Sequence, residues 1–425
     1  RVDWAPDGSK VYVQRQNRSQ TVMDLLQVDP TTGASREVLK EESALPAYWI
    51  NISDDYRFIN GEKPRMIWWS ERDGYAHLYL YGNDGGEPVQ LTKGDWVVTK
   101  LVGVDEEGGK IYFSGTKDGV LEQHIYALNL DGNLRTDADL APRGVPVRLT
   151  ETGFTHSASM DGTGQTLMIT RSSHNQPPQT YLADTTGNPL AWIEKNEVAG
   201  DHPYAKHLAS HRPAQFGTIK AADGITELHY KMVTPEMEPG KQYPVFYYHY
   251  SGPGPQIVTK GWDGALQQAV VDAGYIWFEL DNRGTANRGV VFEQPLFRAM
   301  GGVEVDDQRE GAEYLKTLDF VDPDKIAIYG WSYGGYMSLH MLAQTNLYKS
   351  GVSGAPVTDW TLYDTAYTER YLGDPTPGTA NYTEGAYEDG SVFKYLDGLT
   401  EPVLLIHGMA DDNVVFRHSI KLMDA

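Results

Sequence analysis

A serine flanked by glycines is the strongest chemical signal in the sequence. Gly330, Ser332 and Gly334 follow the short apolar run 326–329 and precede an apolar spacing that is typical of a helix. This pattern predicts a nucleophile elbow, in which only small residues fit two positions either side of the serine. The turn would expose the Ser332 hydroxyl and direct the backbone N–H of Tyr333 toward an oxyanion. Without its context the three-residue pattern is weak evidence, because it also recurs by chance.

A nucleophilic serine needs an acid and a base, which follow it in the order Ser, Asp or Glu, His behind an elbow of this kind. Asp411 is the candidate acid, because it lies in the loop after the apolar run 402–406, at the sheet edge expected for the elbow. Asp412 competes with it. Asp364 and Asp374 have no apolar strand before them and are interpreted as surface or structural residues.

The catalytic base is the missing part of this set. His418 follows Asp411 by seven residues, on the expected helix 416–423, and the other histidines precede Asp411. Seven residues are too few for the chain to leave a loop, add a helix and a strand, and return over the serine. We therefore interpret His418 as a residue of a helix face and His407 as a strand-end residue near the acid loop. The base is expected beyond Ala425.

The first part of the chain predicts repeated β-strands. From residue 1 to about residue 196, strand-like runs are separated by turns, and a turn with aspartate and glycine recurs before a short polar and apolar run. The turn residues Asp29, Asp84, Asp131 and Asp184 are 55, 47 and 53 residues apart, which fits one four-stranded propeller blade per unit. A β-sandwich is the alternative. The period favours a partial β-propeller of about four blade units over residues 1–200, cut at its N-terminus so that a blade edge is exposed.

The second part, residues 201–425, has a different pattern. Three histidines between residues 201 and 212 could indicate a metal cluster, but no carboxylate or cysteine stands at regular ligand spacing, and we interpret the segment as a linker. A hairpin is expected across residues 222–224. Apolar strands at 243–252, 275–280, 325–330 and 402–408 then alternate with helices at 262–273, 305–318 and 337–345. This order predicts an α/β domain with a mainly parallel sheet, incomplete at its C-terminal end.

Composition limits the classes of function. The 425 residues are 40% hydrophobic and 22% charged, as in a globular protein of two domains, and contain no run of 18 apolar residues. The net charge of -22 disfavours nucleic acid and anionic membranes as partners. The absence of cysteine excludes disulfides, thiolate metal sites and cysteine nucleophiles. No metal and no organic cofactor is implied.

Several long motifs stand out along the chain: WSERDGYAHLYLY at 69–81, HYSGP at 249–253, GWSYGGY at 330–336, APVTDWTLYDTAYTERYLGDP at 355–375 and HGMADDNV at 407–414. Together they resemble the dipeptidyl peptidase IV family of the prolyl oligopeptidase clan. The similarity runs over essentially the whole chain. It implies a β-propeller followed by an α/β-hydrolase domain, with Ser332 as nucleophile and Asp411 as triad acid. It also implies that the Tyr250 hydroxyl joins the Tyr333 backbone N–H in an oxyanion hole.

The resemblance also implies a substrate pocket. The residues that match the family's pocket for a proline ring are Val357, Trp360, Tyr363, Tyr367 and Val414, and Asn413 matches a polar contact to the substrate carbonyl. Aromatic walls suit proline, because its ring is rigid and apolar and its nitrogen carries no N–H. Ordinary core packing is the alternative for the tyrosines of this segment.

The glutamate pair with which the family binds the free amino terminus of its substrate has no counterpart that we recognise. The adjacent glutamates in this sequence are Glu41–Glu42, in the polar segment KEES, which we interpret as a turn, and Glu106–Glu107, in an expected hairpin turn. We interpret both as solvated charges. The amine-binding pair is therefore expected outside this chain.

The activity that the resemblance implies is that of a serine exopeptidase releasing N-terminal Xaa-Pro or Xaa-Ala dipeptides. This chain alone is expected to be inactive, because its triad histidine would lie beyond Ala425. The alternatives are an oligopeptidase or acylaminoacyl peptidase of the same clan, or a non-catalytic protein whose propeller is a docking surface for partners. Family analogy implies peptide substrates with a free N-terminus, a periplasmic or secreted location, and a whole protein that could form a homodimer.

Overall fold

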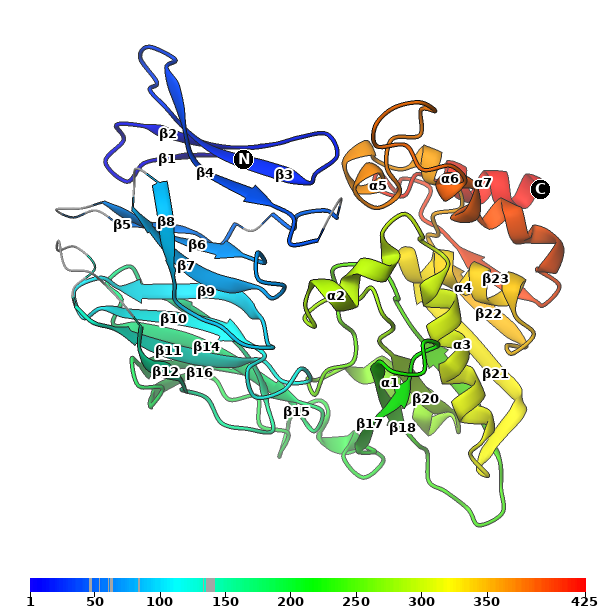
Figure 1. The fold of residues 1–425 in the computed structure, drawn as a ribbon. Helices are drawn as coiled ribbons and strands as arrows, with labels where there is room; N and C mark the ends of the chain where they lie inside the picture. Colours follow the sequence, from blue (N-terminus) through cyan, green and yellow to red (C-terminus); the bar gives the residue numbers. More distant parts are fainter. Residues whose placement is uncertain are drawn as a thin grey trace. The chain divides into compact units, whose positions relative to one another are not determined.

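The computed structural model describes residues 1–45, 48–52, 54–59, 61, 64–82, 85–132, 134 and 142–425. The chain divides into two compact units. The first comprises Arg1–Pro203 with the short segments Lys260–Trp262 and Asn287–Val290, and the second comprises Tyr204–Thr259, Asp263–Ala286 and Val291–Ala425. Figure 1 labels the elements of both.

The described part of the first unit forms four-stranded antiparallel sheets in which each strand pairs with the next in sequence, as in propeller blades (Figure 1). The sheets are β1 to β4 (Val2–Trp4, Val11–Gln16, Val22–Val28, Ser35–Glu42), β5 to β8 (Arg57–Ile59, Arg65–Ser70, His77–Gly82, Gly85–Gln90), β9 to β12 (Val98–Asp105, Lys110–Gly115, His124–Leu130, Pro142–Arg148) and β13 to β16 (Thr155–Met160, Thr166–Ser173, Gln176–Asp184, Pro189–Glu194). The partial propeller that the sequence predicts is confirmed.

The recurring aspartate turn joins the third strand of a blade to the fourth. The Asp29 carboxylate accepts hydrogen bonds from two backbone N–H groups of its turn, at 2.9 and 3.0 Å, and Asp184 does the same at 2.8 and 3.0 Å. Asp131 stands between β11 and β12, whereas Asp84 lies outside the described residues. The sequence period therefore follows from a turn in which aspartate satisfies backbone donors.

Neighbouring blades pack through shared apolar clusters. Ile67 and Leu80 of the second blade lie in one buried cluster with Ile111 and Phe113 of the third. Further clusters join the first blade to the second and the third blade to the fourth. The core of this unit therefore lies between the blades, and each blade depends on its neighbour for burial.

Glu41 contradicts its interpretation as a solvated charge in a turn. Strand β4 extends through Glu42, and the Glu41 side chain points inward with 6% of its surface exposed. It accepts hydrogen bonds from Trp68 Nε1 and Ser70 Oγ, both at 2.8 Å, and pairs with Arg72. Side chains alternate along a strand, so Glu42 faces outward while partners on the second blade satisfy Glu41. Burial raises the pKa of the Glu41 carboxyl.

The second unit is built on a seven-stranded sheet with the order β17-β18-β20-β19-β21-β22-β23. The strands are β17 (Ala214–Lys220), β18 (Glu227–Val233), β19 (Tyr243–Tyr248), β20 (Ile276–Leu280), β21 (Val321–Trp331), β22 (Ser350–Gly354) and β23 (Val403–Ile406). Strands β17 and β18 form the predicted hairpin and β18 is antiparallel to β20, whereas the other neighbouring pairs are parallel. The predicted α/β domain with a mainly parallel sheet is confirmed.

Helices cover both faces of this sheet. Helix α1 packs against β20 in a cluster with Phe246 and Trp277, whereas α3 approaches Tyr247 and Leu280, which point to the opposite face. Helix α4 packs against β21 and β22 (Figure 1). The helices are α1 (Ala265–Asp272), α2 (Val290–Glu293), α3 (Val303–Lys316), α4 (Tyr333–Gln344), α5 (Thr365–Leu372), α6 (Ala386–Asp389) and α7 (Arg417–Asp424), with 3₁₀ turns η1 (Ala205–His207), η2 (Gln294–Leu296), η3 (Trp360–Leu362) and η4 (Val392–Gly398).

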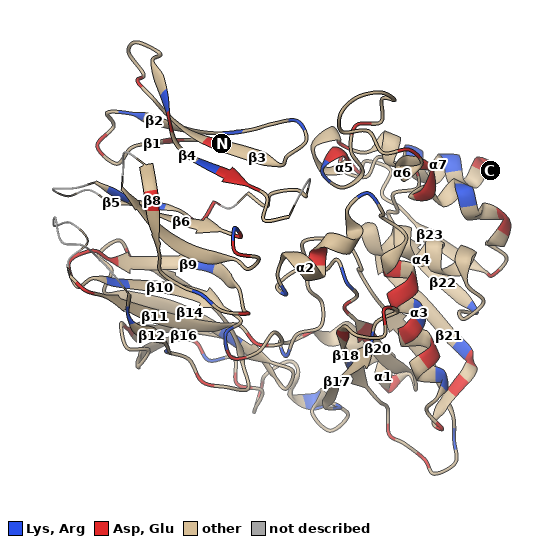
Figure 2. Ribbon diagram, in the orientation of Figure 1, with Lys and Arg blue, Asp and Glu red and all other residues tan. Residues whose placement is uncertain are grey.

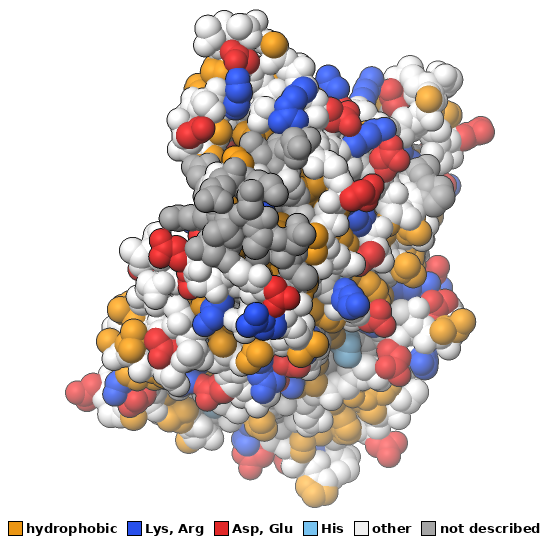
Figure 3. Space-filling model, turned by 60° about the vertical axis from the view of Figure 1, so that its left-hand side comes forward, with side chains coloured by type: hydrophobic (Ala, Val, Ile, Leu, Met, Phe, Trp, Pro, Cys, Tyr) orange, Lys and Arg blue, Asp and Glu red, His pale blue; other side chains and the backbone are white. Residues whose placement is uncertain are grey.

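Charged side chains are distributed through both units. Figure 2 shows acidic residues along α3 and basic residues among acidic ones elsewhere, and on the face in Figure 3 the two signs are interspersed. On that face the acidic excess does not gather into one patch. Among the helices of the described residues, none has the length and apolarity needed to cross a membrane.

Candidate active site

Ser332 lies at the turn from β21 to α4 in a left-handed backbone conformation, with φ at 58°. A residue other than glycine keeps this conformation only where its surroundings hold it. Here the backbone is packed closely, because a Cβ on Gly330 would lie 2.3 Å from the carbonyl oxygen of Gly334. The Ser332 N–H also donates to the carbonyl oxygen of Gly354 at 2.8 Å. The structure therefore has the strand, the tight turn and the helix of a nucleophile elbow.

Two donors converge near Ser332. Tyr333 is the first residue of α4, so its backbone N–H has no partner within the helix and lies at the positive end of the helix dipole. Tyr250 follows β19, and a Cβ on Gly334 of α4 would lie 3.2 Å from its Cα. Burial raises the pKa of the Tyr250 hydroxyl. The Tyr250 and Tyr333 rings lie 6.0 Å apart, over Gly252, where a Cβ would approach the Tyr333 ring to 2.5 Å. This arrangement is suited to stabilising an oxyanion.

Asp411 follows β23, which is separated from β21 by β22 alone in the parallel part of the sheet. The carboxyl ends of parallel strands share one edge, so the loop of Asp411 is on the same edge as Ser332. Its Oδ1 accepts from the backbone N–H groups of Asn413 and Val414, both at 3.0 Å, and its Oδ2 is 3.7 Å from His407 Nε2. Asp412, the competing candidate, is exposed.

The histidines near this loop are positioned as the sequence predicts. The ring nitrogens of His407, just after β23, lie 2.6 Å from Ser419 Oγ and 2.7 Å from the carbonyl oxygen of Val414. His418 lies on α7, fully buried, and its Nδ1 accepts from the Thr358 backbone N–H at 3.1 Å. Burial lowers the pKa of His418 to about 4. His407 therefore joins the acid loop to α7, and His418 joins α7 to the segment of Thr358.

An aromatic cluster lies beside the elbow. The Trp360 ring is 5.7 Å from that of Tyr333, 5.8 Å from that of Tyr363 and 6.0 Å from that of Tyr367. The Tyr363 hydroxyl donates to Asn413 Oδ1 at 3.0 Å, which joins the cluster to the acid loop. The structure thus brings these predicted pocket residues together. The side chains of the two remaining ones, Val357 and Val414, are buried.

The segments that carry the pocket residues are fixed by local contacts. Asp364 accepts from the Tyr367 backbone N–H at 2.8 Å and so caps the start of α5, and Asp374 is buried at the turn that follows this helix. Both aspartates are structural, as predicted. Lys421 of α7 pairs with Asp359 at 2.6 Å, which fastens the residue before Trp360 to that helix.

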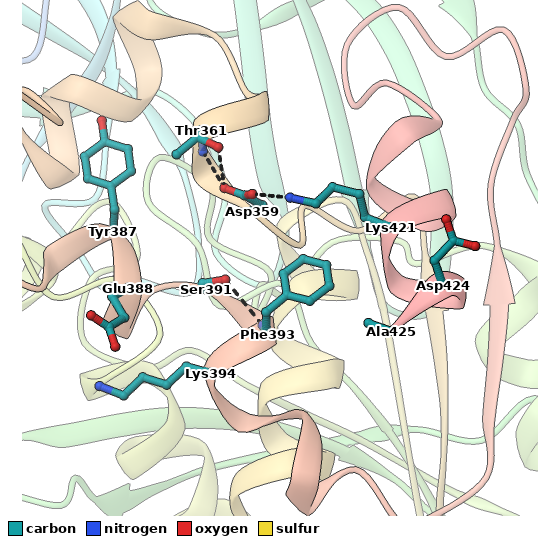
Figure 4. A pocket seen from close by; sticks show the side chains of 10 residues that line it. All are labelled: Asp359, Thr361, Tyr387, Glu388, Ser391, Phe393, Lys394, Lys421, Asp424 and Ala425. Atoms are coloured by element: carbon teal, nitrogen blue, oxygen red, sulfur yellow. Dashed lines mark hydrogen bonds and ion pairs between the residues drawn. The ribbon is translucent and has the colours of Figure 1, made fainter.

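A cavity of about 670 Å³ adjoins this ion pair (Figure 4). It is lined by Asp359, Thr361, Tyr387, Glu388, Ser391, Phe393, Lys394, Lys421, Asp424 and Ala425. None of the predicted site residues is among them. The chemistry of the elbow therefore gives no reason to place the reaction there.

A buried carboxyl group that the sequence analysis did not identify contacts Tyr333. Glu304, in the first turn of α3, is fully buried, and the Tyr333 hydroxyl donates to its Oε1 at 2.5 Å. The Gly301 backbone N–H donates to both carboxyl oxygens at 3.1 Å. Burial raises the pKa of Glu304 to about 7, although these hydrogen bonds act against the rise. Glu304 therefore holds the side chain of the residue that supplies the backbone donor. An acidic residue in a first helical turn is its only sequence signal, and that is an ordinary one.

The raised pKa of Glu304 predicts a pH dependence of stability. Because the folded carboxyl binds its proton more tightly than the unfolded one, stability falls as pH rises from about 4.5 to about 7. At ~1.4 kcal/mol per pH unit this loss is about 3 kcal/mol. Glu304→Gln, which keeps an acceptor for Tyr333 and cannot ionise, should therefore gain stability relative to the unsubstituted protein between pH 4.5 and pH 8.

This gain is measured as the urea midpoint of the transition that unfolds the second unit, for both proteins at both pH values. Glu310→Gln is the matched control, because Glu310 is exposed on the same helix. A difference between Glu304→Gln and the unsubstituted protein that is equal at the two pH values would contradict the assignment.

Two family models match the chain, one in each half. The model described as the dipeptidyl peptidase IV N-terminal region matches residues 1–178, and the model of the prolyl oligopeptidase family matches residues 262–425. The first match falls on the blades and the second contains the elbow and the loop of Asp411.

Known proteins resemble the chain over both units. Dipeptidyl peptidase 8 of Mus musculus is 31% identical over 489 residues, which cover 100% of this chain and 52% of the relative, and dipeptidyl peptidase 4 of Trichophyton equinum is 32% identical over 86% of this chain and 46% of the relative. The crystal structure of Porphyromonas gingivalis dipeptidyl peptidase 4 matches with a TM-score of 0.88 at 27% identity, over 100% of this chain and 57% of that one. The chain spans about half the length of the curated relatives it matches. With a propeller-type unit, an elbow-bearing α/β unit and matches that cover both, the chain belongs to the dipeptidyl peptidase IV family of prolyl oligopeptidase-type serine peptidases.

Proposed function

We propose that the protein is a serine exopeptidase that removes N-terminal dipeptides with proline or alanine as their second residue. The observation that carries this proposal is the left-handed elbow of Ser332 between β21 and α4, with the Tyr250 loop and an aromatic cluster packed beside it. The names of the similar proteins support release of dipeptides, and the apolar rings support a proline in the pocket.

In this reaction the Ser332 hydroxyl attacks the carbonyl carbon that follows the second residue of the substrate. A histidine takes the serine proton and later returns it to the leaving amine, and water then hydrolyses the acyl-enzyme ester. We propose that this histidine comes from a part of the protein outside these 425 residues, because His407 and His418 are bonded to the acid loop and to Thr358. Since two N–H groups hold Oδ1 of Asp411, we assign its Oδ2 to the imidazole.

The oxyanion is stabilised by Tyr250 and Tyr333. As the carbonyl becomes tetrahedral its oxygen gains negative charge, and the Tyr250 hydroxyl and the Tyr333 N–H donate to it more strongly than to the ground state. Burial raises the pKa of Tyr250, so its hydroxyl keeps its proton at neutral pH and remains a donor. The rings of Trp360, Tyr363 and Tyr367 would hold the ring of the substrate proline.

The free amino terminus of the substrate is assigned to a glutamate pair outside this chain. Glu41 does not suit this role, because Trp68, Ser70 and Arg72 already occupy its buried carboxylate. By family analogy alone we also propose a periplasmic or secreted location and a homodimer for the whole protein.

The first test compares Ala-Pro-p-nitroanilide with its N-acetylated form, using the protein with its natural termini. We expect cleavage of the free-amine substrate alone, and Ser332→Ala should lower the rate by about 10⁴-fold or more, because the nucleophile is lost. Release of p-nitroaniline is followed by absorbance. Equal cleavage of both substrates would instead indicate an oligopeptidase or acylaminoacyl peptidase, and cleavage of neither would favour a docking protein.

The second test uses the 425-residue chain by itself. Without a base for Ser332, we expect a fluorophosphonate probe to label it at least about 100-fold more slowly than the protein with its natural termini. Labelling is read by mass spectrometry of the Ser332 peptide, with Ser332→Ala as the blank. Equal labelling rates would show that the base lies within these residues.

A further inference from the structure

The loop that carries Tyr250 has a strained backbone. Ser251, the next residue, adopts φ 70°, which residues other than glycine rarely do. Its side chain and its backbone are both engaged. Gln308 Nε2 lies 3.1 Å from Ser251 Oγ, and Asn282 Nδ2 donates to the Ser251 carbonyl oxygen at 3.0 Å. A conformation of this kind costs about 1–3 kcal/mol and persists because surrounding contacts hold it.

The residue before Tyr250 bridges this loop to the helix of the elbow. The His249 ring is fully buried; its Nδ1 lies 2.9 Å from Ser251 Oγ and its Nε2 lies 3.0 Å from Ser338 Oγ on α4. The His249 backbone N–H donates to the carbonyl oxygen of Tyr329 on β21 at 3.1 Å. One side chain therefore joins both flanks of Tyr250 to the helix that begins at Tyr333.

The hydrogen bonds of this bridge have one consistent direction. Ser338 Oγ donates its single proton to the carbonyl oxygen of Gly334, at 2.8 Å, so it accepts from His249 Nε2–H. Burial lowers the pKa of His249 to about 3, so the ring is neutral and its Nδ1 accepts from the Ser251 hydroxyl. The neutral imidazole is thus fully bonded at both nitrogens, with the proton on Nε2.

Close backbone contact adds to this bridge. A Cβ on Gly334 would lie 2.6 Å from the carbonyl oxygen of His249, so the Tyr250 loop and the first turn of α4 touch directly. A shift of the loop relative to α4 would change the position of the Tyr250 hydroxyl relative to the Tyr333 N–H. The efficiency of an oxyanion hole depends on donors placed within a few tenths of an ångström.

We propose that His249 is a positioning residue for the oxyanion hole: by binding Ser251 and Ser338 through its two ring nitrogens, it sets the Tyr250 hydroxyl relative to the Tyr333 N–H. This inference rests on the proposed peptidase activity. The ring nitrogens of His249 bind Ser251 and Ser338 rather than Ser332. His249 acts through Tyr250, and that dependence distinguishes it from a residue that merely supports the fold.

The test is a double-mutant cycle in the protein with its natural termini, assayed with Ala-Pro-p-nitroanilide. His249→Met fills the site without either ring nitrogen, and should lower kcat about 10- to 100-fold while KM stays within about threefold, because the oxyanion forms only in the transition state. In the Tyr250→Phe background, where the positioned hydroxyl is absent, the same substitution should cost less than about threefold. His249→Gln, which retains a donor and an acceptor, should recover part of the loss.

His340→Met is the matched control, because His340 is equally buried on α4 and its ring packs against Tyr336 rather than the Tyr250 loop. Any loss it causes should be the same with Tyr or Phe at position 250. Equal losses for His249→Met in the two backgrounds would overturn the proposal. If the unsubstituted protein cleaves nothing, the proposed function fails instead, and the two failures are thus distinct.

Neutron diffraction of the unsubstituted protein keeps the proposal testable even if His249→Met does not fold. Deuterium should be found on His249 Nε2 and on the Ser251 hydroxyl, directed at His249 Nδ1. Deuterium on Nδ1, with the Ser338 hydroxyl directed at Nε2, would mean that the hydrogen bonds run in the opposite direction. That result would overturn the assignment.

Discussion

Close backbone packing at the elbow is the constraint on which the rest of the site depends. Ser332 keeps its left-handed conformation because the backbone of Gly330 on β21 packs directly against that of Gly334 on α4. Gly335 packs in the same way against Gly354 of β22. The strain of such a residue is about 1–3 kcal/mol, which the buried helix α4 offsets through its packing on the sheet. The same parallel sheet brings the loop of Asp411 to the edge where Ser332 lies.

Around this elbow the precise positions come from buried polar contacts. Glu304 holds the Tyr333 ring by its hydroxyl, and His249 joins the loop of Tyr250 to α4. Burying a carboxyl or an imidazole is costly unless each polar atom finds a partner, and here the partners are the groups that need positioning. The two donors of the proposed oxyanion hole are thus held by different side chains from different elements, and the Trp360 ring of the pocket packs against one of them, Tyr333.

Local patterns predicted the elements with strong short-range signals and missed those that depend on distant partners. The elbow follows from glycine spacing, and the blades follow from turn aspartates that bond to their own turns. Strand β22, with the sequence SGVSG, has no apolar run and exists because β21 and β23 flank it. Glu41 was misinterpreted because its partners, 27 and 29 residues away, come from another blade. Glu304 and His249 went unrecognised for the same reason: Tyr333 lies 29 residues from Glu304, and Ser338 lies 89 residues from His249.

The measurement that tests the central claim most directly is a crystal structure of the protein with its natural termini after reaction with the dipeptide boronic acid Ala-boroPro. Boron bonded to an oxygen becomes tetrahedral and imitates the intermediate of peptide cleavage. The account predicts a bond from boron to Ser332 Oγ, one boronate oxygen within about 3 Å of both the Tyr250 hydroxyl and the Tyr333 N–H, and the proline-like ring against Trp360. Boron bound to another residue, or a boronate oxygen that contacts neither donor, would contradict it.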